Sequence, residues 1–281
     1  MKDIQYAKPK ELDKTSSFPV GLPRVVESAV SQTTTEVVGA IQLLMREISL
    51  PPKLFDTVYK AELSCRSLQG KINALVELYG GEDATGELRI ASYSVTQFFT
   101  VVADQINKTL GDKIKGEVRF IPDEFSDETV SFDARRVCII LYHLIANAIK
   151  HGRTDNKNVE IRAVVKERNF ELSVRDHGGG IPKEKIPTLF VGYSEPLSLK
   201  TIQESIFPPG IRGIGLPLCR KLTEDMQGEL LFKNYKTGVK FTILLPQQEN
   251  RFRETAVFLP DDTLLRACMA DLLMEFYSAI Q

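Results

Sequence analysis

The feature that most constrains this chain is a pair of apolar runs whose members recur at alternating steps of four and three residues. The first run comprises Val26, Val30, Thr33, Val37, Ile41, Leu44 and Ile48. The second comprises Leu54, Val58, Ala61, Cys65, Leu68, Ile72, Leu75 and Tyr79. This spacing places each run on one stripe of an α-helix. Because Pro51 and Pro52 interrupt the first helix and Gly80 ends the second, the sequence predicts a helical hairpin over residues 23–82.

One hairpin alone would leave much of these two apolar stripes in water. Pairing two hairpins into a four-helix bundle removes that exposure, so we expect a homodimer or a heterodimer. The alternative is a plain hairpin that packs on the second domain of its own chain.

A mixed α/β pattern follows the hairpin. Short β-like runs lie at 116–121, 159–165, 170–174, 229–232 and 239–245, and helical patterns lie at 91–110, 134–150 and 215–227. Helices packed on a sheet fit this order, so we expect an α+β fold with its second domain over 88–247. Residues 1–22 are polar and proline-containing, which is typical of a linker.

Composition limits the classes of partner and location. Lys and Arg number 36 against 37 for Asp and Glu, so no basic field exists that would attract nucleic acid. No apolar run approaches the roughly 20 residues of a membrane span, and we expect none in this chain. The four cysteines show no C-x-x-C spacing, which favours reduced thiols in a cytoplasmic protein.

The helix expected at 134–150 has one polar face, which carries His143, Asn147, Lys150 and His151. A carboxamide oxygen at Asn147 can bind a hard cation such as Mg²⁺, and Lys150 can reach phosphate oxygens from the same face. Taken alone, these residues favour an ordinary solvated helix face, and only the next two motifs change that interpretation.

Two glycine-rich segments follow. The first comes after a strand and reads Asp176-His177-Gly178-Gly179-Gly180-Ile181-Pro182. A carboxylate there can accept a hydrogen bond from an exocyclic amine, while glycines let the backbone turn closely around a flat ligand. The second opens a helix and reads Gly210-Ile211-Arg212-Gly213-Ile214-Gly215-Leu216. Its backbone amides can point at phosphate oxygens.

In this order the motifs over residues 90–247 resemble the GHKL ATP-binding fold of histidine kinases, gyrase, MutL and the ninety-kilodalton chaperones. Two segments resemble the kinase branch: residues 144–151, which match its Asn motif, and Leu189-Phe190, which match its Phe motif. The resemblance implies ATP and Mg²⁺ as cofactors and gives each motif residue a role. The implied roles are Mg²⁺ for Asn147, phosphate contacts for Lys150 and His151, adenine for Asp176, the base pocket for Gly178 and Gly180, and the phosphate cradle for Gly213, Gly215 and Leu216.

Three positions depart from the family pattern. His143 replaces an Asn or an acidic residue, Ile211 replaces a glycine, and Val239 replaces a threonine near adenine. We expect these changes to lower the affinity for ATP.

The phosphoacceptor of that family lies in the first hairpin helix, and here it is missing. The best match to its motif starts at Ser31-Gln32-Thr33. The amide nitrogen of Gln32 is not nucleophilic, because its lone pair is delocalised into the carbonyl. The only histidines are His143, His151 and His177, all outside the hairpin. We therefore expect a pseudokinase of a phosphorelay that does not phosphorylate itself.

The stretch 254–281 contains Asp261 and Asp262 after an apolar run, and it resembles the start of a receiver domain. We interpret it as a possible truncated receiver-like segment; a terminal strand and helix docked on the ATP domain is the alternative.

The expected function is that of an ATP-binding, histidine-kinase-like protein that acts on a partner kinase or on a response regulator. A trans-acting kinase that phosphorylates a partner's histidine and a non-catalytic dimeric scaffold remain open. An ATP-hydrolysing clamp is disfavoured, because it would need an acidic residue near His143.

Overall fold

The computed structural model describes residues 22–79, 87–111, 114–123, 128–153, 155–190 and 215–247. Residues 1–21, Gly80, the phosphate-motif glycine Gly213 and the receiver-like stretch 254–281 lie outside the described residues. Within the described part of the chain, no helix is both long enough and apolar enough to cross a bilayer.

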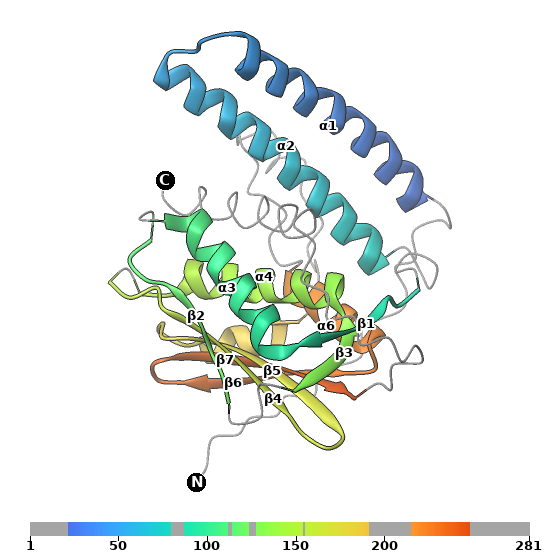
Figure 1. Ribbon diagram of the computed structural model, residues 1–281, viewed down its shortest axis with the longest axis vertical. Helices are drawn as coiled ribbons and strands as arrows, with labels where there is room; N and C mark the ends of the chain where they lie inside the picture. Colours follow the sequence, from blue (N-terminus) through green and yellow to red (C-terminus); the bar gives the residue numbers. More distant parts are fainter. Residues whose placement is uncertain are drawn as a thin grey trace.

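The N-terminal part is a hairpin of α1 (Leu22–Glu47) and α2 (Pro52–Tyr79), seen as the two blue helices in Figure 1. Pro52 occupies the first helical position, where its missing amide proton costs nothing. The helices run antiparallel: Gln42 Nε2 donates to Glu62 Oε1 at 2.9 Å, and Gln69 Nε2 donates to Ser31 Oγ at 3.4 Å. The predicted hairpin is therefore confirmed.

The stripe that the two helices share differs from the predicted one on α1. Thr34 is buried, with 5% of its surface exposed, whereas Thr33 is exposed. Val37, Leu44 and Ile48 of the predicted stripe are 42%, 40% and 54% exposed. The physical reason is that α1 carries apolar residues on more than one side. The hairpin buries only the side of α1 that faces α2.

The second part is a five-stranded sheet with three helices on one face (Figure 1). Its strand order is β2-β4-β5-β7-β6, with β2 parallel to β4 and the other neighbours antiparallel. The strands are β2 (Val118–Ile121), β4 (Val159–Val165), β5 (Asn169–Asp176), β6 (Glu229–Tyr235) and β7 (Gly238–Pro246). The helices are α3 (Val95–Leu110), α4 (Ala134–His151) and α6 (Gly215–Asp225). The expected α+β class is confirmed.

The core lies between the sheet and these helices. Phe99, Phe132 and Phe170 are almost completely buried, and the rings of Phe132 and Phe170 stack with centroids 5.8 Å apart. Alternate residues of β4 and β5, such as Ile161 and Leu172, point into this core. The other face of the sheet is not covered by any described helix (Figure 1).

Two strands were not predicted. β1 (Ile90–Ser94) pairs antiparallel with β3 (Thr129–Asp133) in a separate small sheet. The predicted helix at 91–110 therefore begins only at Val95, where Ser94 Oγ accepts the amide of Gln97 at 3.4 Å and caps α3. A short 3₁₀ helix at Lys183–Thr188, labelled η2, was also not predicted.

Candidate functional site

The helix α4 carries the first group of candidate residues. Asp133 caps its N-terminus, because Oδ1 accepts the amide of Arg136 at 3.0 Å. Its apolar face is buried over its whole length. On the opposite face His143 and Asn147 are half-buried, while Lys150 and His151 are exposed.

Asn147 occupies the centre of this polar face. His143, Asn147 and His151 are spaced four residues apart and so lie one above another on the helix. Among the residues that the structure describes, none makes a hydrogen bond with the Asn147 amide. A half-buried carboxamide without an internal partner suits a ligand from outside the chain.

Asp176 ends β5 and is 9% exposed. Its Oδ1 atom accepts two backbone hydrogen bonds, from the amide of Gly178 at 2.8 Å and from the amide of Val239 at 3.2 Å. No hydrogen bond from a described residue reaches the Oδ2 atom. One carboxylate oxygen is thus held by the fold and the second remains available as an acceptor.

The glycines after Asp176 permit close backbone approaches. A β-carbon on Gly178 would lie 2.8 Å from the carbonyl oxygen of His151, which brings this loop against the end of α4. Gly180 has a φ of +77°, and a β-carbon there would lie 2.7 Å from the carbonyl oxygen of Tyr235. Both positions therefore need glycine for steric reasons.

Asn234 fixes the same loop, although the sequence did not reveal it. Its Oδ1 accepts the amide of Ile181 at 2.9 Å, and its Nδ2 donates to the Ile181 carbonyl at 2.8 Å. Asn234 is the penultimate residue of β6 and follows Lys233, so no local pattern in the sequence marks this contact.

The phosphate-motif helix α6 begins beside the middle of α4. A β-carbon on Gly215 would lie 3.2 Å from Nδ1 of His143. Leu216 is half-buried and packs against the hydrophobic core. Because the Gly178 loop adjoins His151 and Gly215 adjoins His143, Asn147 lies between the two glycine segments. The structure therefore brings the described candidate residues of both motifs to one face of α4.

Lys157 stabilises the end of α4 that carries Lys150 and His151. Its Nζ donates to the carbonyl of Ile149 at 2.6 Å and to the carbonyl of Gly152 at 2.9 Å. Burial lowers the pKa of Lys157 below its usual value. Lysine at a helix C-terminus satisfies carbonyls that the helix leaves unpaired, and nothing in the sequence indicated this role.

The Phe-motif pair Leu189-Phe190 lies at the end of the described range 155–190. Phe190 is buried at 6% exposure, and its ring centroid is 5.9 Å from that of Phe232 on β6. Leu189 is half-buried against the same core.

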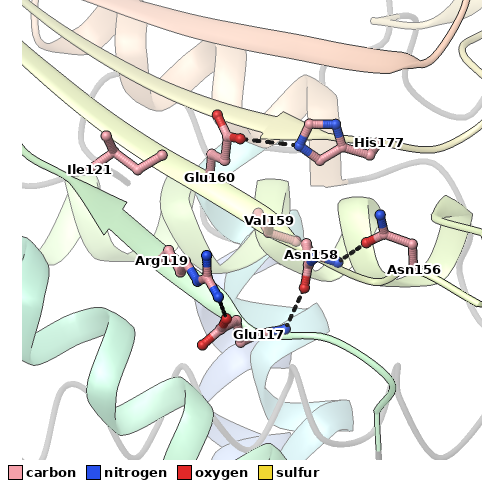
Figure 2. A pocket seen from close by; sticks show the side chains of 8 residues that line it. All are labelled: Glu117, Arg119, Ile121, Asn156, Asn158, Val159, Glu160 and His177. Atoms are coloured by element: carbon pink, nitrogen blue, oxygen red, sulfur yellow. Dashed lines mark hydrogen bonds and ion pairs between the residues drawn. The ribbon is translucent and has the colours of Figure 1, made fainter.

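A small cavity of about 150 Å³ lies at the β2 edge of the sheet (Figure 2). Its lining includes His177, whose Nε2 is 3.2 Å from Oε1 of Glu160. Burial raises the pKa of Glu160, but hydrogen bonds from His177 and Arg162 outweigh burial and leave that pKa below its usual value. The cavity contains none of the candidate residues on α4 or α6.

Gln32, which the sequence predicts as the counterpart of the phosphoacceptor, is polar and exposed. Gln32 Nε2 donates to Glu36 Oε1 at 3.1 Å along the surface of α1. The Thr33 hydroxyl donates to the backbone carbonyl of Ala29 at 2.9 Å. Within the described residues, no group of three or more His, Cys, Asp or Glu side chains could hold a metal ion.

Residues 132–249 match the family model described as histidine kinase-, DNA gyrase B-, and HSP90-like ATPase. The signal transduction histidine-protein kinase AfsQ2 of Streptomyces coelicolor is 30% identical over 116 residues, which is 41% of this chain and 20% of AfsQ2. The sensor histidine kinase GacS of Pseudomonas protegens is 25% identical over 194 residues, 66% of this chain and 20% of GacS. The chain thus spans about a fifth of these relatives.

Solved structures share the fold. Full-length ShkA in complex with AMPPNP has a TM-score of 0.61 at 18% identity, covering 81% of this chain and 46% of that one. The histidine kinase AdeS of Acinetobacter baumannii has a TM-score of 0.53 at 19% identity, covering 78% of this chain and 97% of that one. Both likenesses extend over more than three quarters of this chain.

Proposed function

Because the chain belongs to the two-component sensor histidine kinase family, through its ATPase-type domain, we propose that it binds Mg-ATP and acts on a signalling partner without phosphorylating its own hairpin. The observation that carries this proposal is the placement of the histidines. His143, His151 and His177 all belong to the α/β part of the chain, and the matching hairpin position is Gln32.

The nucleotide half of the proposal is supported by the arrangement around α4. The Oδ2 atom of Asp176 would accept a hydrogen bond from the exocyclic amine of adenine, while Oδ1 keeps the surrounding loop in place. The amide oxygen of Asn147 would bind Mg²⁺, and Lys150 and His151 would face the phosphates. Mg²⁺ would neutralise phosphate charge. Gly215 would let the first amides of α6 approach the same phosphates, with Leu216 anchoring that helix and Gly213 preceding it.

The ATP affinity is expected to be lower than the family pattern alone would suggest. Val239 reaches Asp176 only through its backbone amide, so it supplies no hydroxyl near the base. His143 places an imidazole beside Gly215, where the family has a carboxamide or a carboxylate.

The hairpin lacks the nucleophile that would accept the phosphoryl group. An imidazole nitrogen in this position would attack the γ-phosphate, and a neighbouring carboxylate would take its proton. Gln32 has no nucleophilic nitrogen, and the Thr33 hydroxyl is bonded to Ala29. The nucleophile is therefore absent from α1, and the carboxylate nearest to Gln32 is that of Glu36, one helical turn away, instead of one on the next residue.

The partner half of the proposal is supported by the uncovered side of the hairpin. Its exposed apolar side chains are Val37, Leu43, Leu44, Ile48, Leu54, Phe55 and Leu68. A second hairpin, from the same chain or from a histidine kinase, would cover this surface as a four-helix bundle. A response regulator or receiver domain would be the downstream partner in a cytoplasmic phosphorelay.

A trans-acting kinase is the second candidate, and the preserved Asn147 and Asp176 favour it over an inert scaffold. The discriminating experiment mixes the protein with a partner kinase that has its phosphoacceptor histidine but an inactivated ATP site, in the presence of γ-labelled ATP. Label on the partner would establish trans phosphorylation. Unlabelled partner together with altered activity of an intact partner kinase would establish regulation instead.

A further inference from the structure

The sheet face opposite the helices carries a row of three cations across three neighbouring strands. Arg175 of β5 pairs in register with Lys240 of β7, which pairs in register with Lys233 of β6. All three point away from the core, because their neighbours Val174, Phe241 and Phe232 point into it. The strands involved are adjacent at the lower edge of Figure 1.

Like charges directly opposite each other destabilise a sheet, so this row has a cost. Glu160 of β4 stands in register with Arg175 on the same face, but no ion pair joins these two side chains. Glu160 pairs with Arg162 and His177, and Glu171 pairs with Lys166. Within the described residues, no ion pair involves Arg175, Lys233 or Lys240, and the Nε atom of Arg175 is buried without a hydrogen-bond partner.

Tyr235 adds an aromatic surface to the row. The Arg175 guanidinium carbon lies 4.9 Å from its ring centroid, and the Lys233 nitrogen lies 5.1 Å from it. Both side chains are held over the ring and are therefore partly ordered before any ligand binds.

The shape of the row indicates which anion it fits. Strands are about 4.8 Å apart, so three cations span about 10 Å and do not converge on one small ion. That length matches two or three carboxylates of a peptide. A long polyanion is less suitable, because the ion-paired acids Glu160 and Glu171 share the face and the whole chain has a net charge of −1.

We propose that Arg175, Lys233 and Lys240 around Tyr235 form a docking site for an acidic segment of a partner protein. The site is on the opposite face of the sheet from Asp176 and does not depend on the proposed nucleotide binding. A partner bound there would contact Arg175 of β5, which directly precedes Asp176, the carboxylate of the candidate base pocket.

Binding is tested with fluorescein-labelled deca-glutamate on the full chain, with deca-glutamine as the control peptide, by fluorescence anisotropy. The double variant Lys233→Gln/Lys240→Gln should weaken deca-glutamate binding by roughly 5- to 30-fold. The matched control is Arg119→Gln, on the same face but paired with Glu117, and it should change the affinity less than two-fold. Affinity for Mg-ATP should not change in either variant.

Thermal unfolding gives a second readout. Lys240 lies between the cations Arg175 and Lys233, so Lys240→Gln should raise the Tm by roughly 1 to 3 °C. The same change should lower the affinity for deca-glutamate. The proposal is overturned if wild-type protein does not bind deca-glutamate, or if the double variant binds it as well as wild type. Tighter binding of a single-stranded oligonucleotide or of phosphatidylserine vesicles through the same lysines would also overturn it.

Discussion

The Oδ1 atom of Asp176 accepts the backbone amide of Val239 at 3.2 Å, and this bond joins the end of β5 to the start of β7. The same oxygen also accepts the amide of Gly178. One atom of the carboxylate therefore has a structural role, while the other is the candidate acceptor for a base. These two roles can be separated by mutation.

Asp176→Asn should separate them. An asparagine can keep its oxygen toward Gly178 and Val239 but then presents an NH₂ group, which is a donor, to the adenine amine. We expect ATP affinity to fall by about 1 to 3 kcal/mol while the Tm changes little. Isothermal titration calorimetry and thermal unfolding measure the two effects. The control is Asp155→Asn, a change at an exposed position. If Asp176→Asn bound ATP with the same affinity as the wild-type protein, the assignment of the base pocket would be wrong.

Gly180 and its neighbour Gly179 form a matched pair of test positions. Gly180→Ala must place a β-carbon about 2.7 Å from the Tyr235 carbonyl at a φ of +77°. We expect a loss of roughly 1 to 3 kcal/mol in stability and weaker nucleotide binding. Gly179→Ala meets nothing within 4 Å, and it should change stability by less than about 0.5 kcal/mol. Chemical denaturation distinguishes them, and equal losses would contradict the role of the turn.

From the uncovered apolar side of the hairpin we expect the chain to form a homodimer or a heterodimer with a partner kinase. Val37→Glu/Leu44→Glu should convert a dimer into a monomer, because both side chains are exposed apolar groups of α1. Thr35→Glu, an exposed change elsewhere on the helix, is the control. Sedimentation equilibrium at micromolar concentration provides the readout. A wild-type monomer would argue against a homodimer and leave a heterodimer to be tested with a partner kinase.

Glu160 predicts a pH-dependent contribution to stability. Burial raises its pKa, but the bonds from His177 and Arg162 leave it below the ordinary value. A lowered carboxylate pKa stabilises the fold above the unfolded-state pKa, and this contribution disappears as pH falls through the folded-state pKa. Glu160→Gln should therefore lower the Tm at pH 7, and the difference should shrink as the pH falls through the lowered folded-state pKa of Glu160. A Tm difference that is independent of pH would contradict this expectation.

Local patterns predicted the long elements well. The helix at 134–150 and the strand at 159–165 match α4 and β4, because each combines a clear period with apolar residues such as Ile140 and Ile161 on one side. The strand β1 was hidden, since its sequence Ile90–Ser94 is half polar and joins α3 without a break. Its stability comes from pairing with β3, which is distant in sequence.

The sequence indicated only those candidate-site residues that belong to local motifs. Asp176, Gly178 and Asn147 belong to local motifs, so the sequence alone indicated them. Asn234 acts on Ile181, which is 53 residues away, and Lys157 acts on carbonyls at the end of α4. Contacts of this kind depend on the tertiary fold and leave no periodic trace in the sequence.

The acceptor position allows a gain-of-function test. Gln32→His should restore little labelling, because Thr33 supplies no carboxylate and general-base help is worth about 100-fold or more. Gln32→His/Thr33→Glu supplies both groups on the exposed surface of α1. Acid-labile label should therefore be higher in the double variant than in the single one. Equal labelling of the two variants would show that the proton acceptor lies elsewhere.

The most direct test of the central claim incubates the unmodified protein alone with Mg²⁺ and γ-labelled ATP and follows binding and labelling in the same sample. We expect saturable ATP binding, abolished by Asn147→Ala, together with no base-stable, acid-labile phosphate on the chain. Such a phosphate on the wild-type protein would rule out the proposed function, because His143, His151 or His177 would then be a working acceptor. Absence of ATP binding would also contradict it and would leave the scaffold as the function.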